Sequence, residues 1–156
     1  MASLSDLPVR DKVYAYILRK SNAGSQLLVF EHVDFPDAGI QVPGGTVEAG
    51  ETIFAAVQRE AAEETGLLDL VFRGELGSIK RDMRGLGFHE VHHRHYFLFY
   101  CKDCKRETWI GYEETPSDGA EGPIALRLFW VDLSAVPPLL GGLDEMLSSL
   151  FFVDRI

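Results

Sequence analysis

The chain has little that could form a covalent framework or a membrane anchor. It has 156 residues and only two cysteines, too few for a disulfide scaffold, which favours a cytoplasmic protein with reduced thiols. No apolar run reaches the roughly 20 residues of a membrane-spanning helix. The first residues, MASLSDLPVRDK, lack the apolar core of a signal peptide. We therefore expect no membrane partner.

Positive charge is also scarce. Lysine and arginine number 15 against 24 aspartates and glutamates, a net charge of −9, which argues against a non-specific grip on nucleic acid. The length fits one domain over residues 1–156, and hydrophobic residues make up an ordinary 46% of it. The sequence predicts a single-domain protein without a nucleic-acid partner and leaves a homo-oligomer open.

Segments rich in β-branched and aromatic residues alternate with turn signals and predict a series of strands. We expect strands over 12–19, 25–33, 70–81, 89–101 and 124–133, with a short one at 40–42. The segment 102–123 is polar and rich in glycine, proline and acid, which indicates a long loop. Near the end of the chain, apolar residues at i, i+3, i+4 and i+7 predict a helix over 142–152: Leu143, Met146, Leu147 and Leu150.

A second helix is predicted in mid-chain, over residues 53–65. Thr52 is a typical N-cap residue and Gly66 a typical residue just after a helix end. Phe54, Val57 and Ala61 form one apolar stripe that we expect to face a sheet. Mixed strands and helices in this order predict an α/β sandwich, with a mixed central sheet and helices on its faces.

The mid-chain helix carries an unusual concentration of acid. Glu60, Glu63 and Glu64 are related by three and four positions and project from one helix face. One interpretation is a solvated face with an internal pair to Arg59. The other is a site for Mg²⁺ or Mn²⁺, which prefer oxygen ligands, with the carbonyl of Gly44 as a further ligand.

These residues form a recognisable pattern. The Nudix box reads G-x5-E-x7-R-E-U-x-E-E-x-G-U, where U is apolar, and residues 45–67 match every fixed position. The matching residues are Gly45, Glu51, Arg59, Glu60, Ala61, Glu63, Glu64, Gly66 and Leu67. The chain thus resembles the Nudix hydrolase superfamily, whose sandwich fold has a similar order of elements.

The resemblance implies a metal-dependent pyrophosphohydrolase that cleaves a nucleoside diphosphate linked to another group. Glu60, Glu63 and Glu64 are then metal ligands, together with the Gly44 carbonyl. Arg59 and Glu51 form a pair that holds the loop against the helix. A cation between the carboxylates and the anionic substrate is consistent with the acidic charge of the chain.

The general base and a further ligand stay open. One of the box glutamates serves as base in some relatives, and a carboxylate of a downstream loop does so in others. The candidates in that loop are Glu113, Glu114, Asp118 and Glu121. We favour Glu121 as an added metal ligand, and the alternative is a solvated loop acid.

Four further residues are candidate substrate contacts. Arg81 and Arg84 could meet phosphates, and Trp109 and Tyr112 could stack on a base. Each has an ordinary structural alternative. In the strand over 89–101, His93 and His95 share one face and His92 and Arg94 the other, and one face is expected to line a pocket or an interface.

Cys101 and Cys104 form a C-x-x-C motif. Zinc would need two more ligands, and a redox pair would need an activating helix N-terminus. We expect two cysteines without a chemical role.

The substrate class stays open between nucleotide-sugars, nucleoside triphosphates and dinucleoside polyphosphates. A second hypothesis for the whole chain is a Nudix-like sensor that binds a nucleotide without turnover.

Overall fold

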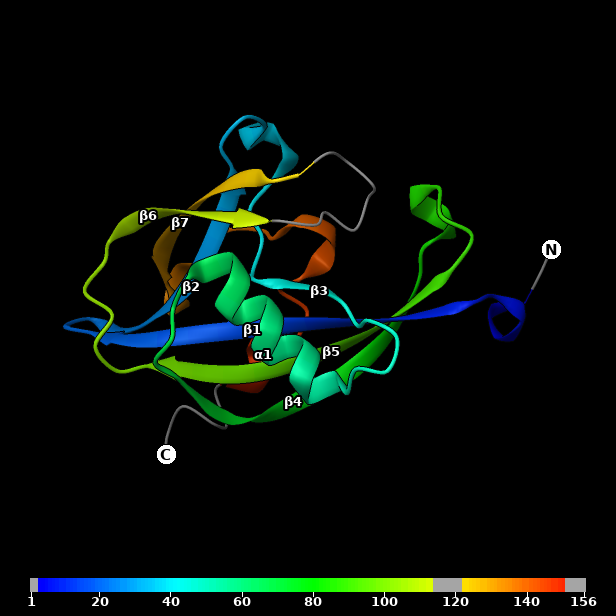
Figure 1. Ribbon diagram of the computed structural model, residues 1–156, viewed down its shortest axis with the longest axis horizontal. Helices are drawn as coiled ribbons and strands as arrows, with labels where there is room; N and C mark the ends of the chain where they lie inside the picture. Colours follow the sequence, from blue (N-terminus) through cyan, green and yellow to red (C-terminus); the bar gives the residue numbers. More distant parts are fainter. Residues whose placement is uncertain (1–2, 114–121, 151–156) are drawn as a thin grey trace.

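Seven strands form one mixed sheet in the computed structural model, which describes residues 3–113 and 122–150 (Figure 1). The sheet order is β4-β5-β1-β2-β7-β6, and β3 pairs with β1. The strands are β1 (Val9–Ser21), β2 (Gly24–His32), β3 (Gly44–Thr46), β4 (Leu70–Asp82), β5 (Val91–Cys101), β6 (Thr108–Glu113) and β7 (Ile124–Asp132). The β1–β5 pair is parallel and the other pairs are antiparallel. The predicted mixed α/β fold is confirmed.

The helix α1 (Ile53–Thr65) packs on one face of this sheet. Val57 and Ala61 are buried there as predicted, against Val13 and other apolar residues of β1 and β5. Phe54 is different, since 41% of it is exposed, and its ring packs edge-on against Phe72 of β4. Ala56 is the third buried apolar residue of the helix. The apolar stripe is therefore rotated by part of a turn from the predicted one.

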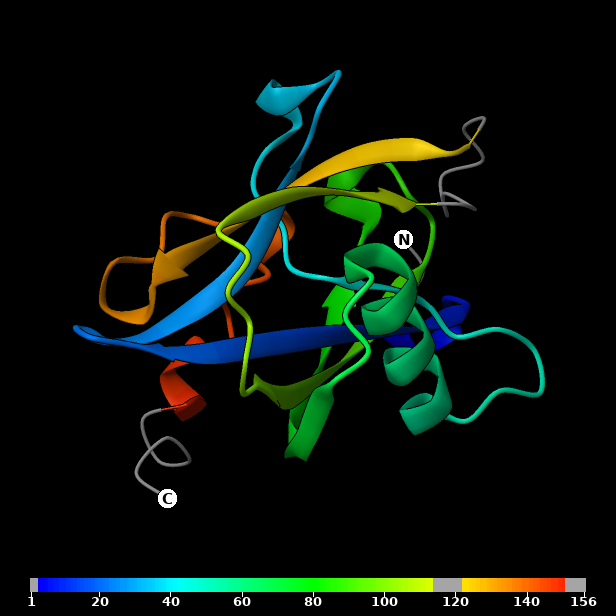
Figure 2. The same cartoon turned by 60° about the vertical axis from the view of Figure 1, so that its left-hand side comes forward.

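The opposite face of the sheet is covered by the last described part of the chain. Figure 2 shows these turns on the other side of the sheet from α1. Leu143 and Leu150 are buried there with Tyr16 and Tyr96. Tyr16 donates a hydrogen bond of 2.5 Å to the carbonyl of Leu143, which ties this segment to β1.

The helix predicted over 142–152 is wrong for its described residues, 142–150. They form turns and short 3-10 segments, η5 (Leu140–Gly142) and η6 (Leu147–Ser149). Gly142, the first residue of the predicted helix, has a φ of 74°, a left-handed conformation in which a right-handed helix cannot start. The apolar periodicity of the segment therefore arises from burial of its side chains against the sheet and does not indicate an α-helix.

Two other predictions of extended structure need correction. Residues 40–42 form one isolated bridge, between Gln41 and Phe30, and the strand lies later, at β3. The predicted loop over 102–123 contains β6, which pairs with β7 through Trp109 and Leu128. A strand at the edge of a sheet keeps a polar exposed side, so its composition resembles that of a loop.

Within the described residues, none of the helices is both long enough and apolar enough to cross a membrane.

Candidate functional site

Local capping fixes the bounds of α1 and hence the direction of its acidic side chains. The Oγ1 atom of Thr52 accepts a hydrogen bond of 3.0 Å from the amide of Ala55. Gly66 is left-handed, with φ of 71°, and its amide donates to the carbonyl of Ala62. The helix predicted over 53–65 is confirmed, with both predicted ends.

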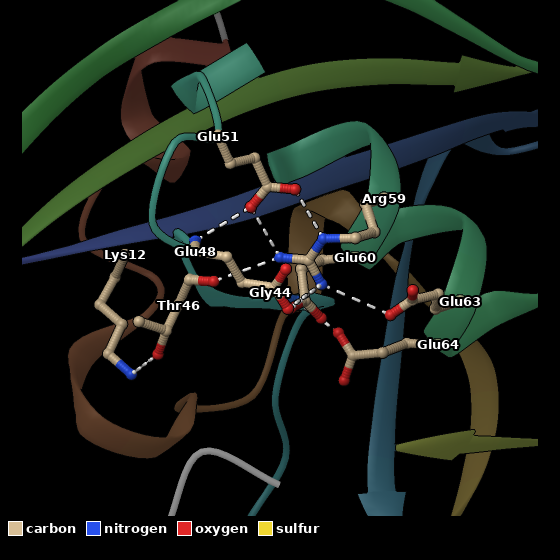
Figure 3. Close-up of polar contacts among 9 residues, drawn as sticks. All are labelled: Lys12, Gly44, Thr46, Glu48, Glu51, Arg59, Glu60, Glu63 and Glu64. Carbon is tan, nitrogen blue, oxygen red and sulfur yellow. Dashed lines mark hydrogen bonds and ion pairs between the residues drawn. The ribbon is translucent and has the colours of Figure 1, made fainter. Parts of the chain in front are cut away.

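The acidic face of α1 meets the backbone of β3, as Figure 3 shows. The amide of Gly44 donates a hydrogen bond of 2.7 Å to Oε1 of Glu64. A Cβ atom at Gly45 would overlap the carboxylate of Glu60, and one at Gly44 would overlap the ring of Tyr14. Glycine at 45 thus lets the Glu60 carboxylate approach the strand, and glycine at 44 leaves room for the ring of Tyr14.

The three glutamates differ in burial. The Glu64 residue is 3% exposed, whereas the side chain of Glu60 is 15% exposed and that of Glu63 is 48% exposed. Burial raises the pKa of Glu60 to about 7, against the opposing effect of Arg59. Burial also raises the pKa of Glu64 well above its usual range, and the neighbouring charges of Glu60 and Glu113 add to the shift. At Glu60 burial outweighs the ion pair with Arg59, and the hydrogen bond that lowers the pKa of Glu64 comes from the neutral amide of Gly44.

Arg59 links the helix to the loop before it (Figure 3). Its Nε and Nη2 atoms donate to the two carboxylate oxygens of Glu51 at 2.7 and 2.9 Å. The same guanidinium donates to Glu60 at 2.8 Å and to the carbonyl of Thr46 at 3.3 Å. It lies 3.5 Å from Glu63. The hydrogen bonds from Arg59 lower the pKa of Glu51 to about 2.

Sequence reasoning missed Lys12, a buried cation close to these acids. Its side chain lies on the face of β1 opposite α1, and its Nζ atom donates a hydrogen bond of 2.6 Å to Oγ1 of Thr46. Lys12 is 7% exposed. Burial lowers its pKa, while the nearby charges of Glu60 and Glu113 act in the opposite direction. The signal lies in the β1–β3 pairing, which the sequence does not display.

Among the predicted loop acids, the structure describes only Glu113, the last residue of β6. Side chains alternate along a strand, so Glu113 lies on the same side of β6 as Gly111, which is packed against the carbonyl of Glu64. Its charge contributes to the raised pKa values of Glu60 and Glu64. Glu114, Asp118 and the favoured Glu121 lie outside the described residues.

The two arginines proposed as substrate contacts make ion pairs. Arg81 lies 3.3 Å from Glu145 on the face of the sheet opposite α1. Arg84 lies 2.6 Å from Asp82 in the turn after β4. The structure does not bring either arginine to the carboxylates of α1.

The two aromatic candidates of β6 differ from each other. Trp109 donates a hydrogen bond of 2.8 Å from Nε1 to the carbonyl of Thr65 and packs near Trp130. It is thus a packing residue at the end of α1. Tyr112 is 49% exposed, on the side of β6 away from α1.

The expectation of reduced thiols is wrong in this structure, since Cys101 and Cys104 form a disulfide. The chain turns directly after β5, which brings their Cα atoms to 5.6 Å, a distance that permits the bond.

A family model and two kinds of relatives place the chain among known proteins. The model of the NUDIX domain matches residues 9–149. The chain belongs to the Nudix family. An ADP-ribose pyrophosphatase of Methanocaldococcus jannaschii is 42% identical over 72 residues, covering 44% of this chain and 41% of that protein. The Nudix chain thus aligns with less than half the length of this relative.

Solved structures show the same fold at low identity. The Ap4A hydrolase of C. elegans, in a binary complex, has a TM-score of 0.66 at 16% identity, covering 94% of this chain and 99% of that chain. A MutT protein from Methanosarcina mazei Go1 has a TM-score of 0.64 at 18% identity, covering 97% and 99%.

The residues of the Nudix box suit a divalent cation, which enzymes of this family generally use. The donor set consists of carboxylate oxygens on one face of one helix, the chemistry that Mg²⁺ and Mn²⁺ prefer. The raised pKa values of Glu60 and Glu64 point the same way, because a bound cation would stabilise both charges.

Proposed function

We propose that this Nudix chain is a metal-dependent pyrophosphohydrolase that cleaves a nucleoside diphosphate linked to another group. The observation that carries the proposal is the pair of largely buried carboxylates Glu60 and Glu64, which lie against Gly45 and Gly44 and whose pKa values are raised by burial despite the ion pair between Arg59 and Glu60. An acidic site of this kind is costly unless it serves to hold positive charge.

In this proposal, Glu60, Glu63 and Glu64 hold Mg²⁺ or Mn²⁺, with the backbone of Gly44 beside them. A bound divalent cation would supply charge neutralisation for the diphosphate and polarise an attacking water. Glu63 is the most exposed of the three and is open to solvent and substrate. The proton of that water passes to one of the box glutamates, to Glu113 or to Glu121.

Arg59 and Glu51 position these carboxylates. The two hydrogen bonds between them fix the guanidinium, which then holds Glu60 at 2.8 Å. A fixed arrangement of charge around the reacting phosphorus stabilises the transition state without reorganisation during the reaction.

Lys12 is proposed to contact a substrate phosphate oxygen. It is a buried cation beside Thr46, the last residue of the strand that carries Gly44 and Gly45. Acidic side chains alone would repel a diphosphate, so a fixed ammonium at the edge of the site favours its binding.

The substrate is proposed to be a nucleoside diphosphate derivative such as ADP-ribose or a dinucleoside polyphosphate. The names of the matched pyrophosphatase and of the Ap4A hydrolase structure support this class. Tyr112 is the remaining candidate for a base contact. We further propose that residues 1–156 act as one cytoplasmic domain without nucleic-acid or membrane partners.

An assay of product release distinguishes the enzyme hypothesis from the sensor hypothesis. The chain is incubated with ADP-ribose, a nucleotide-sugar, a nucleoside triphosphate and a dinucleoside polyphosphate, each with Mg²⁺, Mn²⁺ or excess EDTA. The proposal expects cleavage of at least one compound that EDTA abolishes. Turnover undiminished in EDTA would refute the metal requirement. Tight nucleotide binding without cleavage of any compound would favour the sensor.

A further inference from the structure

Two histidines and an aspartate form a cluster outside the Nudix box. Asp11 of β1 lies opposite His93 in the parallel β1–β5 register, and His95 is two residues further along β5. Because side chains alternate along strands, all three lie on the same face of the sheet. This is the face on which α1 packs. Val13 lies two residues after Asp11 and Phe97 two residues after His95, and both belong to the core beneath that helix.

The potential ligand atoms of the cluster converge on one point. Oδ1 of Asp11 lies 3.0 Å from Nε2 of His95 and 3.5 Å from Nδ1 of His93. One ligand atom from each residue lies within 4.8 Å of the others. Ligand atoms about 2.1 Å from a tetrahedral zinc ion are about 3.4 Å apart, so both measured distances are close to those of a coordinated set.

A second contact fixes one of the rings. The other nitrogen of His93, Nε2, lies 3.0 Å from the hydroxyl of Ser78 on β4. Such a partner holds the ring of a ligating histidine in orientation and leaves the opposite nitrogen free to bind an ion. The three side chains also project from paired strands, which hold a site more precisely than loops do.

The cluster is accessible from solvent. The side chains of Asp11, His93 and His95 are 45%, 28% and 12% exposed. Asp11 also lines an open cleft of about 800 Å³ between the start of β1 and the loop before α1, where Glu51 lies as well. An ion can therefore enter, and water can complete its coordination.

We propose that Asp11, His93 and His95 form a second metal site that takes a transition-metal ion such as Zn²⁺. Two imidazoles and one carboxylate suit Zn²⁺, Fe²⁺ or Co²⁺, whereas Mg²⁺ prefers oxygen ligands. The site is thus chemically distinct from the carboxylate face of α1. It does not depend on the hydrolase proposal.

The ion would join β1 to β5 beside the loop that leads into α1. The amide of Val47 in that loop donates a hydrogen bond of 3.1 Å to the carbonyl of Asp11. Metal binding at the cluster is therefore expected to raise the unfolding temperature of the folded chain, because it stabilises only the folded state.

Calorimetric titration of the full chain with Zn²⁺ in excess Mg²⁺ tests the site. We expect one equivalent of Zn²⁺ to bind. Asp11→Asn and His93→Gln should each weaken binding by about 10-fold or more, since even outer partners of a metal site contribute that much. In both variants, the rise in unfolding temperature on Zn²⁺ addition should also disappear.

Three controls separate this site from others. His92→Gln changes a histidine of the same strand on the opposite face, and Glu63→Gln changes the Nudix box. Changing both Cys101 and Cys104 to Ser removes the two sulfur atoms of the disulfide. All three variants should bind Zn²⁺ as the wild type does. Absence of saturable Zn²⁺ binding in the wild type, or full binding by His93→Gln, would overturn the proposal. His93 is partly exposed, so that variant is expected to fold.

Discussion

The amide of Gly44 and the carboxylate of Glu64 are joined by a hydrogen bond of 2.7 Å. The bond links β3 to the last turn of α1 and aims a nearly buried carboxylate at the diglycine backbone. The resemblance to Nudix enzymes implies a ligand role for the Gly44 carbonyl. The hydrogen bond places the acidic side chain beside the same residue, so one contact fixes the positions of two proposed ligands.

Glu64→Gln separates catalysis from folding. Glutamine keeps the volume of the side chain and an oxygen that accepts a hydrogen bond from Gly44. It removes an ionisable group whose pKa is raised by burial. We expect the metal-free variant to melt higher, by about 2–4 °C for each kcal/mol gained. Turnover should fall by about 10²- to 10⁴-fold, the range for loss of a proton-transfer group.

Glu48→Gln is the matched control for that change. Its side chain is 65% exposed and lies 3.8 Å from Arg59, so activity and melting should stay close to wild type. Turnover and thermal melting with and without Mg²⁺ give both readouts. If the single variants Glu64→Gln and Glu63→Gln both kept wild-type turnover, the box would not be the reaction centre.

Arg59→Ala should lower stability and activity together. It leaves Glu51 and Glu60 without their guanidinium, and hydrogen bonds to charged groups contribute about 1.5–3 kcal/mol each. We expect a loss of about 2–3 kcal/mol in denaturant unfolding. Arg59→Lys keeps the charge and loses the bidentate contact with Glu51. Its stability and activity should therefore lie between those of the wild type and those of Arg59→Ala.

Arg10→Ala serves as the control for Arg59→Ala, because the side chain of Arg10 is 46% exposed and its Nε atom lies 3.5 Å from the carboxylate of Glu90. Its effect should stay below about 1 kcal/mol. Unchanged stability of Arg59→Ala combined with lost activity would instead indicate direct contact between Arg59 and substrate.

Metal-free stability should depend on pH through Glu60. Its pKa is about 7 in the folded chain against a usual 4.5, so between these values the folded state holds a proton that the unfolded state lacks. The free energy of unfolding therefore falls as pH rises from about 4.5 through 7, by about 1–3 kcal/mol. Glu51 acts in the opposite sense at lower pH, because its stabilisation is lost as pH falls towards about 2.

Denaturant unfolding in EDTA across this range measures the effect of Glu60. Glu60→Gln should make the decline shallower, with the rest left to Glu64, whose pKa is also raised, and Mg²⁺ should oppose the decline in the wild type. An equally steep decline in Glu60→Gln would assign the dependence to another group.

The elements that sequence analysis predicts correctly are those specified locally. The helix α1 carries its own capping residues, Thr52 and Gly66, and its bounds follow from them. The strands of the sheet interior carry central apolar runs, as Leu27–Phe30 of β2 shows. Spacing alone also places Glu60 and Glu64 on one helix face.

The elements that sequence analysis misses depend on contacts between distant segments. Strand β6 is polar because it lies at the sheet edge, and only its pairing with β7 reveals it. Lys12 comes close to the box because β3 pairs with β1. Gly142, the first residue of the last predicted helix, is left-handed, although the apolar spacing after it is helical.

Lys12→Met tests the proposed phosphate contact. Methionine keeps the buried stem and removes the ammonium, so the fold should persist and melting should stay equal or rise. We expect kcat/KM to fall by about 10- to 100-fold, the loss of about 1.4–2.7 kcal/mol of transition-state binding. Lys20→Met, on the same strand and exposed, should have no effect. Metal affinity that falls along with activity would point to a structural role instead.

Gly45→Ala tests the close approach of the helix carboxylates to β3. A Cβ atom there would overlap the Glu60 carboxylate, and that carboxylate would have to move away from β3 and from Arg59. We expect weaker Mg²⁺ binding and turnover reduced by about 10²-fold, because small displacements of reacting groups cost that much. Gly85→Ala is the matched control, since a Cβ atom at Gly85 has no neighbour within 4 Å. Magnesium titration and turnover on both variants decide the point. Full activity of Gly45→Ala would show that Glu60 does not need its place beside β3.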